Sequence, residues 1–194
     1  MGAVRDPEAT KARIFAAASA EFAAYGIAGA RIDRIAREAS ANKQLIYAYF
    51  GNKAELFSQV LEKRLMELAV AIPVDAEDPD GWIDRLMDYH AAHPELIRLV
   101  FWEGLEYGTG GIPHEEERRE HYARKIAVFA EAQEKGVISP AIPAQDLLFM
   151  LIALASWATV QPQMRRIIIG ETEEDTARLR ASVRSAARRL TGLA

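Results

Sequence analysis

The segment from Ile32 to Lys53 constrains the fold most, because two short helical patterns there are separated by a brief break. In the first pattern, apolar residues at spacings of three and four share one helix face; they are Ile32, Ile35, Ala36 and Ala39. The break follows at Ser40, and Asn42 can then cap a second helix that begins at about Lys43. The segment therefore predicts two short helices joined by a tight turn.

The second of these helices has an inner and an outer side. Ile46 and Phe50 lie one turn apart and predict the inner side. Gly51 is a natural helix end, and Asn52 can cap a third helix beginning at Lys53. Two short helices of this kind indicate a helix-turn-helix, whose second helix enters the major groove of DNA.

Side chains on the outer side of the second helix are the candidates for reading base edges. Gln44 can pair with adenine, and Lys43 can pair with guanine. Tyr47 is a third base-edge candidate, and Leu45 can touch a thymine methyl group. This helix therefore offers the side-chain types needed for direct reading of sequence.

Phosphate contacts are expected from Arg31, Tyr49 and Lys53. Lys53 begins a helix, and the exposed backbone N–H groups of a helix start favour an anion. Each candidate also has a purely structural interpretation. Tyr47 and Tyr49 can be half-buried aromatic residues with a solvated hydroxyl group, and single lysines and arginines are more often solvated than bound to phosphate. Their clustering on one short unit favours the DNA-binding interpretation.

The stretch from Thr10 to about Phe57 resembles the DNA-binding domain of the TetR family of bacterial transcriptional regulators. The matching residues are Thr10-Lys11, Ile14, Ala16-Ala17-Ala18, Phe22, Gly26, Ile35-Ala36, Ala39, Leu45-Ile46-Tyr47, Phe50, Lys53 and Leu56. This ordered set covers roughly a quarter of the chain and is far more specific than a helix-turn-helix pattern alone.

Two places depart from the family pattern. Ala30 and Arg31 stand where the family usually has two hydroxyl residues that cap the helix beginning at Ile32, so we expect a weaker cap and a phosphate contact from Arg31. Ser40 stands where the family usually has a glycine in the turn. If that position requires a positive φ, serine adopts it at a cost of about 1 kcal/mol.

The resemblance implies an all-α fold with two domains and a role in transcription. Residues 1–52 would form a three-helix DNA-binding domain, and residues 53–194 a larger helical domain for ligand binding and dimerisation. The expected function is that of a repressor, which binds a palindromic operator in double-stranded DNA as a homodimer and is released by a small-molecule effector. No enzymatic activity and no cofactor are expected.

The balance of basic and acidic residues differs between the two parts of the chain. Residues 1–64 hold 10 Lys and Arg against 7 Asp and Glu, whereas residues 65–194 hold 14 against 21, so the basic part contains the proposed reading helix. The chain has no cysteine, which suits a reducing cytoplasm. Its longest apolar run, residues 147–155, is shorter than the roughly 20 residues that span a bilayer, so we expect a cytoplasmic protein without membrane contact.

The remaining sequence predicts helices almost throughout and no sheet. Asp6 and Pro7 mark the start of a helix that runs to about Tyr25. The other predicted helices are 53–72, 82–93, 94–107, 115–135, 144–160 and 172–193. The only β-branched run, 167–169, is too short to form a sheet.

Two of these helices predict association with a second copy. Helix 144–160 is apolar almost all round, and helix 172–193 carries an apolar stripe on an arginine-rich background. In the TetR family such helices form a four-helix bundle across a two-fold axis. The predicted interface residues are Leu147, Leu151, Leu154, Leu179, Val183 and Leu190. The alternative is that both helices only close the core of their own subunit.

The middle helices combine aromatic and polar residues, as small-molecule sites do. The predicted effector contacts are Trp82, Tyr89, Trp102, Glu106, Tyr122 and Phe129. A plain helical core would contain much the same residues, so this alternative stays open. We expect the effector to act by moving the helix that begins at Lys53, which would change the separation of the two reading helices.

Other classes of function have less support. His90 and His93 could bind a metal together with Glu103 or Glu106, but histidine on a helix surface is the commoner case. No nucleophile motif or phosphate-binding glycine loop is present. The remaining alternative is an all-helical module that binds a ligand or a protein and does not read DNA.

Overall fold

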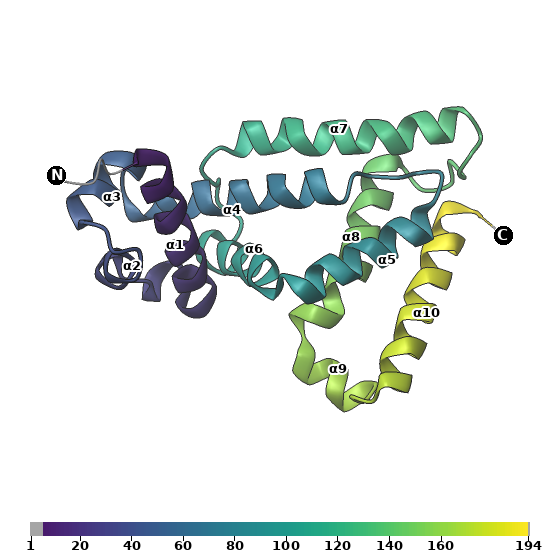
Figure 1. Ribbon diagram of the computed structural model, residues 1–194. Helices are drawn as coiled ribbons and strands as arrows, with labels where there is room; N and C mark the ends of the chain where they lie inside the picture. The colour runs from purple at the N-terminus through teal and green to yellow at the C-terminus, as the bar shows by residue number, and fades with distance from the viewer. Residues whose placement is uncertain (1–5, 194) are drawn as a thin grey trace. The chain divides into compact units, whose positions relative to one another are not determined.

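The computed structural model describes residues 6–193, and all regular structure within them is helical (Figure 1). The ten helices are α1 (Pro7–Gly29), α2 (Ile32–Glu38), α3 (Lys43–Phe50), α4 (Lys53–Ala71), α5 (Pro79–Ala92), α6 (Pro94–Tyr107), α7 (Glu115–Glu134), α8 (Ala144–Val160), α9 (Pro162–Ile168) and α10 (Glu173–Thr191). The predicted all-α class is therefore confirmed.

Several helix boundaries follow from local capping chemistry. The Asp6 side chain accepts the Glu8 N–H at 2.9 Å at the start of α1, and Pro7 stands in the first turn. Helix α10 has a reciprocal capping box between Thr172 and Asp175, with acidic residues in its first turn. These N-terminal caps lie where the sequence indicates helix starts.

Helix α5 begins at Pro79, three residues before its predicted start, and two further features differ from the prediction. Helix α1 continues past Tyr25 to Gly29 across a kink at Gly26, where φ is 69°. Helix α9 is an additional short helix, and its start at Pro162 agrees with the preference of proline for a first helical turn. The β-branched run 167–169 therefore lies at the end of a helix.

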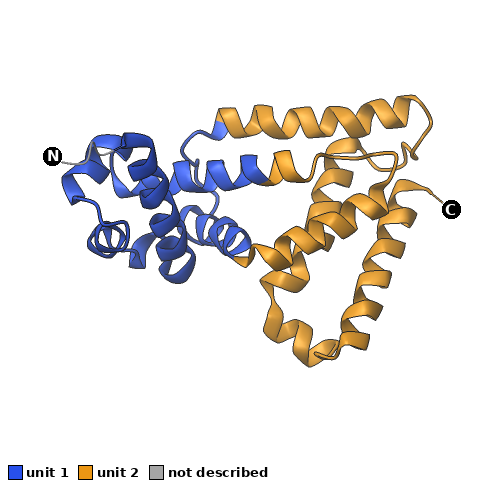
Figure 2. Cartoon of the chain, viewed as in Figure 1, with its two compact units in different colours: residues 1–67, 95–115 blue, residues 68–94, 116–194 orange. Residues whose placement is uncertain are grey.

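The chain divides into two compact units (Figure 2). Unit 1 comprises residues 1–67 and 95–115, and unit 2 comprises residues 68–94 and 116–194. The chain passes between them within α4, after the first residue of α6 and after the first residue of α7. The predicted boundary between residues 52 and 53 concerns functional domains and stays a prediction.

Each unit has its own buried residues. In unit 1, the rings of Phe22 on α1 and Phe57 on α4 meet edge to face, with centroids 5.2 Å apart, and both are fully buried. In unit 2, Trp82 on α5 packs against Phe129 on α7 with centroids 5.9 Å apart. Leu147 and Leu151 of α8 belong to the same core.

Candidate nucleic-acid interface

Helices α2 and α3 form the predicted helix-turn-helix. Ser40 in the turn has φ 49°, so this position does require the left-handed backbone that glycine favours. The Asn42 side chain accepts the Gln44 N–H at 2.8 Å, and Gly51 ends α3 with φ 73°. Arg31, at the N-cap of α2, makes no side-chain capping bond, as its departure from the family pattern predicted.

The outer side of α3 is open to solvent. Lys43, Gln44 and Tyr47 are exposed, and Tyr47 keeps 49% of its surface accessible. Leu45 is half-buried at the edge of this face, whereas Ile46 is buried. The side chains predicted to read base edges therefore lie on the accessible side of the helix.

Two side chains of α3, Lys43 and Tyr49, have neighbours from other helices. Lys43 forms an ion pair with Asp33 of α2. The half-buried Tyr49 has the Lys11 ammonium 5.4 Å from the centre of its ring. The second contact places the Lys11 ammonium group beside α3, whereas the charge of Lys43 is balanced by Asp33 in the free protein.

Lys53 is the predicted phosphate ligand whose surroundings are most informative. Its ammonium group donates to the backbone carbonyl groups of Ala28 at 3.2 Å and Ala30 at 3.3 Å, so it closes the C-terminal end of α1. The Asn52 side chain caps the start of α4 by accepting the Glu55 N–H at 3.0 Å. Lys53 thus ties α4 to α1.

Glu21 is a residue that the sequence interpretation missed. It is 8% exposed and accepts the Arg31 backbone N–H at 2.8 Å and the Arg34 Nε at 2.8 Å. Burial raises the pKa of Glu21, but the bonds from Arg34 and Arg31 outweigh it and leave the pKa below its ordinary value. A carboxylate between the apolar positions Ala18 and Phe22 was the signal that could have identified it.

The predicted effector contacts fall in both units. Trp82 and Phe129 are in the core of unit 2, and Tyr122 packs against that core. Tyr89 is half-buried, and its ring centre lies 4.3 Å from that of His93. Trp102 and Glu106 belong to α6 in unit 1.

Unit 2 also buries three polar nitrogen atoms that have no hydrogen-bond partner among residues 6–193: Trp82 Nε1, His90 Nδ1 and His121 Nε2. His90 is 2% exposed, so it is not the helix-surface histidine that was expected as the commoner case. Burial lowers the pKa of His90, although a bond to the Ala155 backbone partly opposes this. Burial, with Lys125 and Arg124 nearby, lowers the pKa of His121.

Helices α8, α9 and α10 of unit 2 enclose a mainly apolar groove of about 1220 Å³. Its lining includes Phe149 and Trp157, which are 76% and 51% exposed. Leu154, Leu179, Val183 and Leu190 of the predicted interface also line it, although Val183 is itself only 8% exposed. Leu147 and Leu151 instead have no exposed surface, because they pack inside their own chain.

No group of three or more metal-ligating side chains comes together within residues 6–193. In the same residues no single helix has the length and apolar character needed to cross a membrane. Helices α8 and α9 meet those criteria only when taken together, and they are bent by 85° relative to each other.

An exposed α3 held by a capped turn, with cationic side chains around it, is the geometry of a DNA-reading helix-turn-helix. Residues 14–60 match the family model for bacterial regulatory proteins of the tetR family. Residues 78–189 match a tetracyclin repressor-like C-terminal domain. The chain belongs to the TetR family and is a helix-turn-helix transcriptional repressor.

Individual relatives agree with this assignment. The chain is 67% identical over 188 residues to the HTH-type transcriptional repressor SCO4008 of Streptomyces coelicolor, a match that covers 97% of this chain and 98% of the relative. It is 32% identical to a putative transcriptional regulator, SCO4942, from the same organism, whose crystal structure gives a TM-score of 0.79 and covers 93% of this chain and 97% of the other.

A third protein supports the fold alone. The regulator FadR of Bacillus subtilis, solved in complex with stearoyl-CoA, is 16% identical with a TM-score of 0.67. The match covers 95% of this chain and 99% of that one.

Proposed function

We propose that this repressor acts as a homodimer in the cytoplasm, that it binds a palindromic operator, and that a small-molecule effector releases it. The observation that carries the proposal is the exposed outer side of α3, where Lys43, Gln44 and Tyr47 project from a helix fixed by Asn42 and Gly51. Two such helices, one from each subunit, would meet half-sites about 34–36 Å apart.

Within this interface we assign two kinds of contact. Lys43, Gln44 and Tyr47 read base edges, because they project from the exposed side of α3. Leu45, at the edge of this side, contacts a thymine methyl group. Arg31, Tyr49 and Lys53 contact phosphates. Lys53 does so while its ammonium group also closes α1, because an ammonium group has three donors and the two carbonyl bonds occupy two of them.

Selection of bound sites from random duplex DNA tests this assignment. We expect a palindromic site, and we expect Gln44→Ala to relax preference at one position in each half-site. Arg31→Ala is the matched comparison, because loss of a phosphate contact weakens all sequences about equally. The assignment is contradicted if the wild-type protein enriches no sequence. It is also contradicted if Gln44→Ala loses affinity for all sequences equally.

The proposed dimer interface is the groove between α8 and α10. Aromatic residues such as Phe149 and Trp157 are rarely left this exposed on an isolated monomer, and burial of such anchors dominates the energetics of interfaces. We therefore centre the interface on Phe149, Leu154, Trp157, Leu179 and Leu190. The fully buried Leu147 and Leu151 support it from beneath.

Sedimentation of the purified protein tests the interface. Trp157→Lys places a charge in the groove and should convert the dimer to a monomer at micromolar concentration. Val70→Lys is the control, because Val70 is 83% exposed and does not line the groove. A dimer that persists in Trp157→Lys, or one lost equally in both variants, would place the interface elsewhere.

The effector site that we propose in unit 2 is built around its unpartnered polar atoms. A buried donor or acceptor without a hydrogen-bond partner lowers the stability of the folded protein by about 1–3 kcal/mol. A ligand that provides the missing partner therefore gains affinity. Because one His90 nitrogen bonds the Ala155 backbone, the other, Nδ1, accepts from a ligand donor, while Trp82 Nε1 donates. Tyr122 and Phe129 would supply aromatic contacts to an apolar or aromatic ligand carrying both donor and acceptor groups.

The predicted contacts from Tyr89, Trp102 and Glu106 stay predictions. The proposed mechanism is that the effector shifts α4, which continues from unit 2 into unit 1, and so changes the separation of the reading helices. It can do this only by binding the two arrangements with different affinity.

A melting-temperature screen with small aromatic compounds tests the site. Hits should stabilise the wild type, and His90→Leu should reduce the shift for hits that carry a hydrogen-bond donor. His93→Leu serves as the control. If the hits act equally on all three proteins, the proposed anchors are wrong, and if no hit weakens DNA binding, the release mechanism fails.

A further inference from the structure

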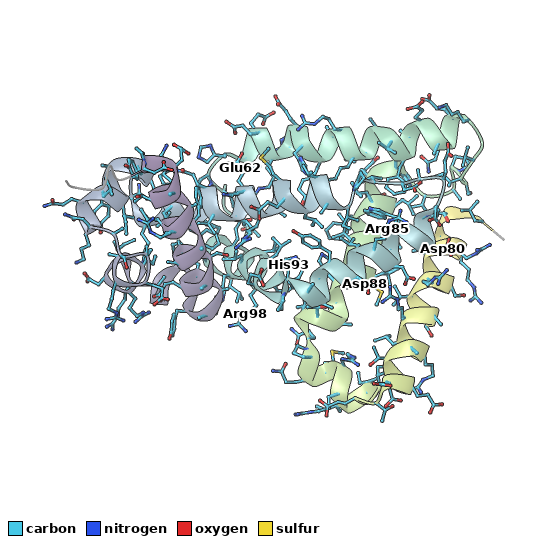
Figure 3. All side chains as sticks on the ribbon, viewed as in Figure 1. Glu62, Asp80, Arg85, Asp88, His93 and Arg98 are labelled. Carbon is cyan, nitrogen blue, oxygen red and sulfur yellow. The ribbon has the colours of Figure 1, made fainter. Side chains whose placement is uncertain are left out.

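The backbone carbonyl of Ala23 in α1 accepts two hydrogen bonds from α6, within unit 1. Arg98 Nε donates to it at 2.6 Å and Trp102 Nε1 donates to it at 3.1 Å. Arg98 and Trp102 are four residues apart, so both donors lie on the same face of α6. Figure 3 labels Arg98 on this helix.

The two bonds meet α1 just before its kink. At Gly26 the backbone takes φ 69° and ψ −178°, which ends the regular helical path three residues after Ala23. A helix interior supplies one donor to each carbonyl, from the residue four positions later, so a kink is where outside donors are most useful. Arg98 and Trp102 provide such donors at this point.

The indole ring also requires glycine at the kink. A Cβ atom added to Gly26 would lie 2.7 Å from Trp102 Cε3 and 2.8 Å from Trp102 Cδ2, closer than carbon atoms can approach. The two donors, the ring, Ala23 and Gly26 form a unit that we call the Ala23 clamp. It fixes α6 to α1 both along the helix and across it.

The part of α1 that is clamped also holds the helix-turn-helix. Glu21, two residues before Ala23, accepts the backbone N–H of Arg31 at the start of α2. Arg34 of α2 bonds the same carboxylate and also donates to the Gly29 carbonyl at 3.0 Å. A displacement of the clamped turn is therefore passed to the N-terminus of α2 through short, directional bonds.

We propose that Arg98 and Trp102 are positioning residues for DNA binding: through the Ala23 clamp, the position of α6 sets the orientation of α2 and α3. Besides α4, α6 is then a second helix that sets the orientation of the reading helix. The inference rests on the proposed function only in so far as α3 reads the operator, because the clamp itself is a contact within unit 1.

Amide hydrogen exchange and operator titration test the clamp together. Arg98→Met and Trp102→Phe each remove a donor while retaining most of the side-chain volume, and Arg98→Lys is a milder variant should Arg98→Met fail to fold. The control is Gln133→Met in unit 2, because Gln133 Nε2 likewise donates to two backbone carbonyls, those of Ser139 at 3.0 Å and Ile142 at 2.7 Å. All variants are compared well below their melting temperatures.

We expect both clamp variants to speed amide exchange in α2 and α3 and to weaken operator affinity by about three- to thirtyfold, in line with typical coupling energies. Gln133→Met should speed exchange around α7 and leave α2 and α3 unchanged. If faster exchange stays confined to α6 and the end of α1 and operator affinity matches that of Gln133→Met, the clamp is merely structural and the proposal is wrong.

The two measurements separate failure of the clamp from failure of the proposed function. If the wild-type protein selects no operator, the DNA-binding assignment fails, and exchange in α2 and α3 still decides whether the clamp positions them. If the wild type binds its operator and the variants bind equally well, only the clamp proposal fails.

Discussion

The contact between α1 and α6 in unit 1 differs in kind from the contact between α5 and α10 in unit 2. In unit 1, side chains reach backbone groups of other segments: Arg98 and Trp102 bond Ala23, Lys53 bonds Ala28, and Arg13 bonds Ala39 at 3.1 Å. In unit 2, α5 and α10 are joined by ion pairs between side chains. A backbone carbonyl has a fixed place on its helix. A charged side chain can instead change its rotamer and keep its ion pair when the facing helix shifts.

The ion pairs of unit 2 form a ladder. Asp80, Asp84 and Asp88 repeat every four residues on α5, and they face Arg180, Arg184 and Arg188, which repeat every four residues on α10. Figure 3 labels Asp80 and Asp88 on α5. The difference indicates that the contact between α1 and α6 fixes the position of the two helices, whereas the contact between α5 and α10 can adjust. Four predictions test that comparison.

The largest effect should come from Gly26→Ala in unit 1. Alanine must adopt a positive φ and overlap the Trp102 ring, and together these should cost about 2–5 kcal/mol of unfolding free energy. Gly104→Ala is the control, because nothing lies within 4 Å of the added Cβ in the last turn of α6. The control should gain up to about 1 kcal/mol in urea unfolding. Equal results for both would remove the argument for a tight joint at Gly26.

A smaller loss is expected for Glu21→Gln, which removes the charge from the bonds to Arg34 and to the Arg31 backbone. Hydrogen bonds to charged groups contribute about 1.5–3 kcal/mol, so we expect a loss of about 2 kcal/mol. Glu8→Gln breaks an exposed pair with Lys11 and should cost under about 1 kcal/mol. Thermal unfolding measures both, and a Glu21→Gln protein as stable as Glu8→Gln would contradict the proposed role of Glu21.

Arg180→Met tests unit 2. Arg180 pairs with Asp84 at 2.6 Å and with Asp88, and both carboxylates are partly exposed, so the loss should be about 1 kcal/mol. The difference from wild type should shrink at about 1 M salt because such pairs are screened. The loss in Gly26→Ala should not change with salt. A salt-independent Arg180→Met would mean that the ladder acts through packing of the arginine side chain.

The smallest effect should be a slope in stability with pH that belongs to unit 2. Because burial lowers the pKa of His90 and His121 in the folded chain, the unfolded chain binds more protons as the pH falls through the ordinary histidine value of about 6.5. Unfolding free energy should therefore decline from pH 7 towards more acidic values, and His90→Gln should flatten the decline.

Unit 1 should lose stability in a lower pH window. The lowered pKa of Glu21 means that its contribution is present at neutral pH and is lost only as the pH falls below about 4.5. Hydrogen exchange at several pH values resolves the two units. Loss of protection in both units over the same range would contradict this separation.

Local chemistry explains which parts of the fold could be predicted. The caps at Asp6, Asn42 and Asn52 and the stop at Gly51 depend on neighbouring residues alone, and all four were predicted from the sequence. The start of α5 at Pro79 was predicted three residues too late. The sequence does contain the signal for this helix start, because Asp78 before Pro79 repeats the Asp6-Pro7 pair at the start of α1.

Long-range contacts could not be predicted in the same way. The donors to Ala23 are 75 and 79 residues away in the sequence, and no periodic pattern connects them to α1. The exclusion of a side chain at Gly26 likewise comes from Trp102, which is distant in the sequence. For the candidate DNA interface, exposure of Lys43, Gln44 and Tyr47 followed from helical periodicity, whereas the bonds from Lys53 to α1 depend on tertiary packing.

The ladder between α5 and α10 says little about how the two helices should be aligned. One stripe is entirely Asp and the other entirely Arg, so a slip by one turn, about 5.4 Å, would still leave most charges opposite a partner. Information about register must come from groups that have only one fitting place: buried Val183 and Ala187, and the Ser139 N–H bonded to the Thr191 carbonyl at 2.8 Å. The charges select the neighbour, and the small apolar residues select the alignment.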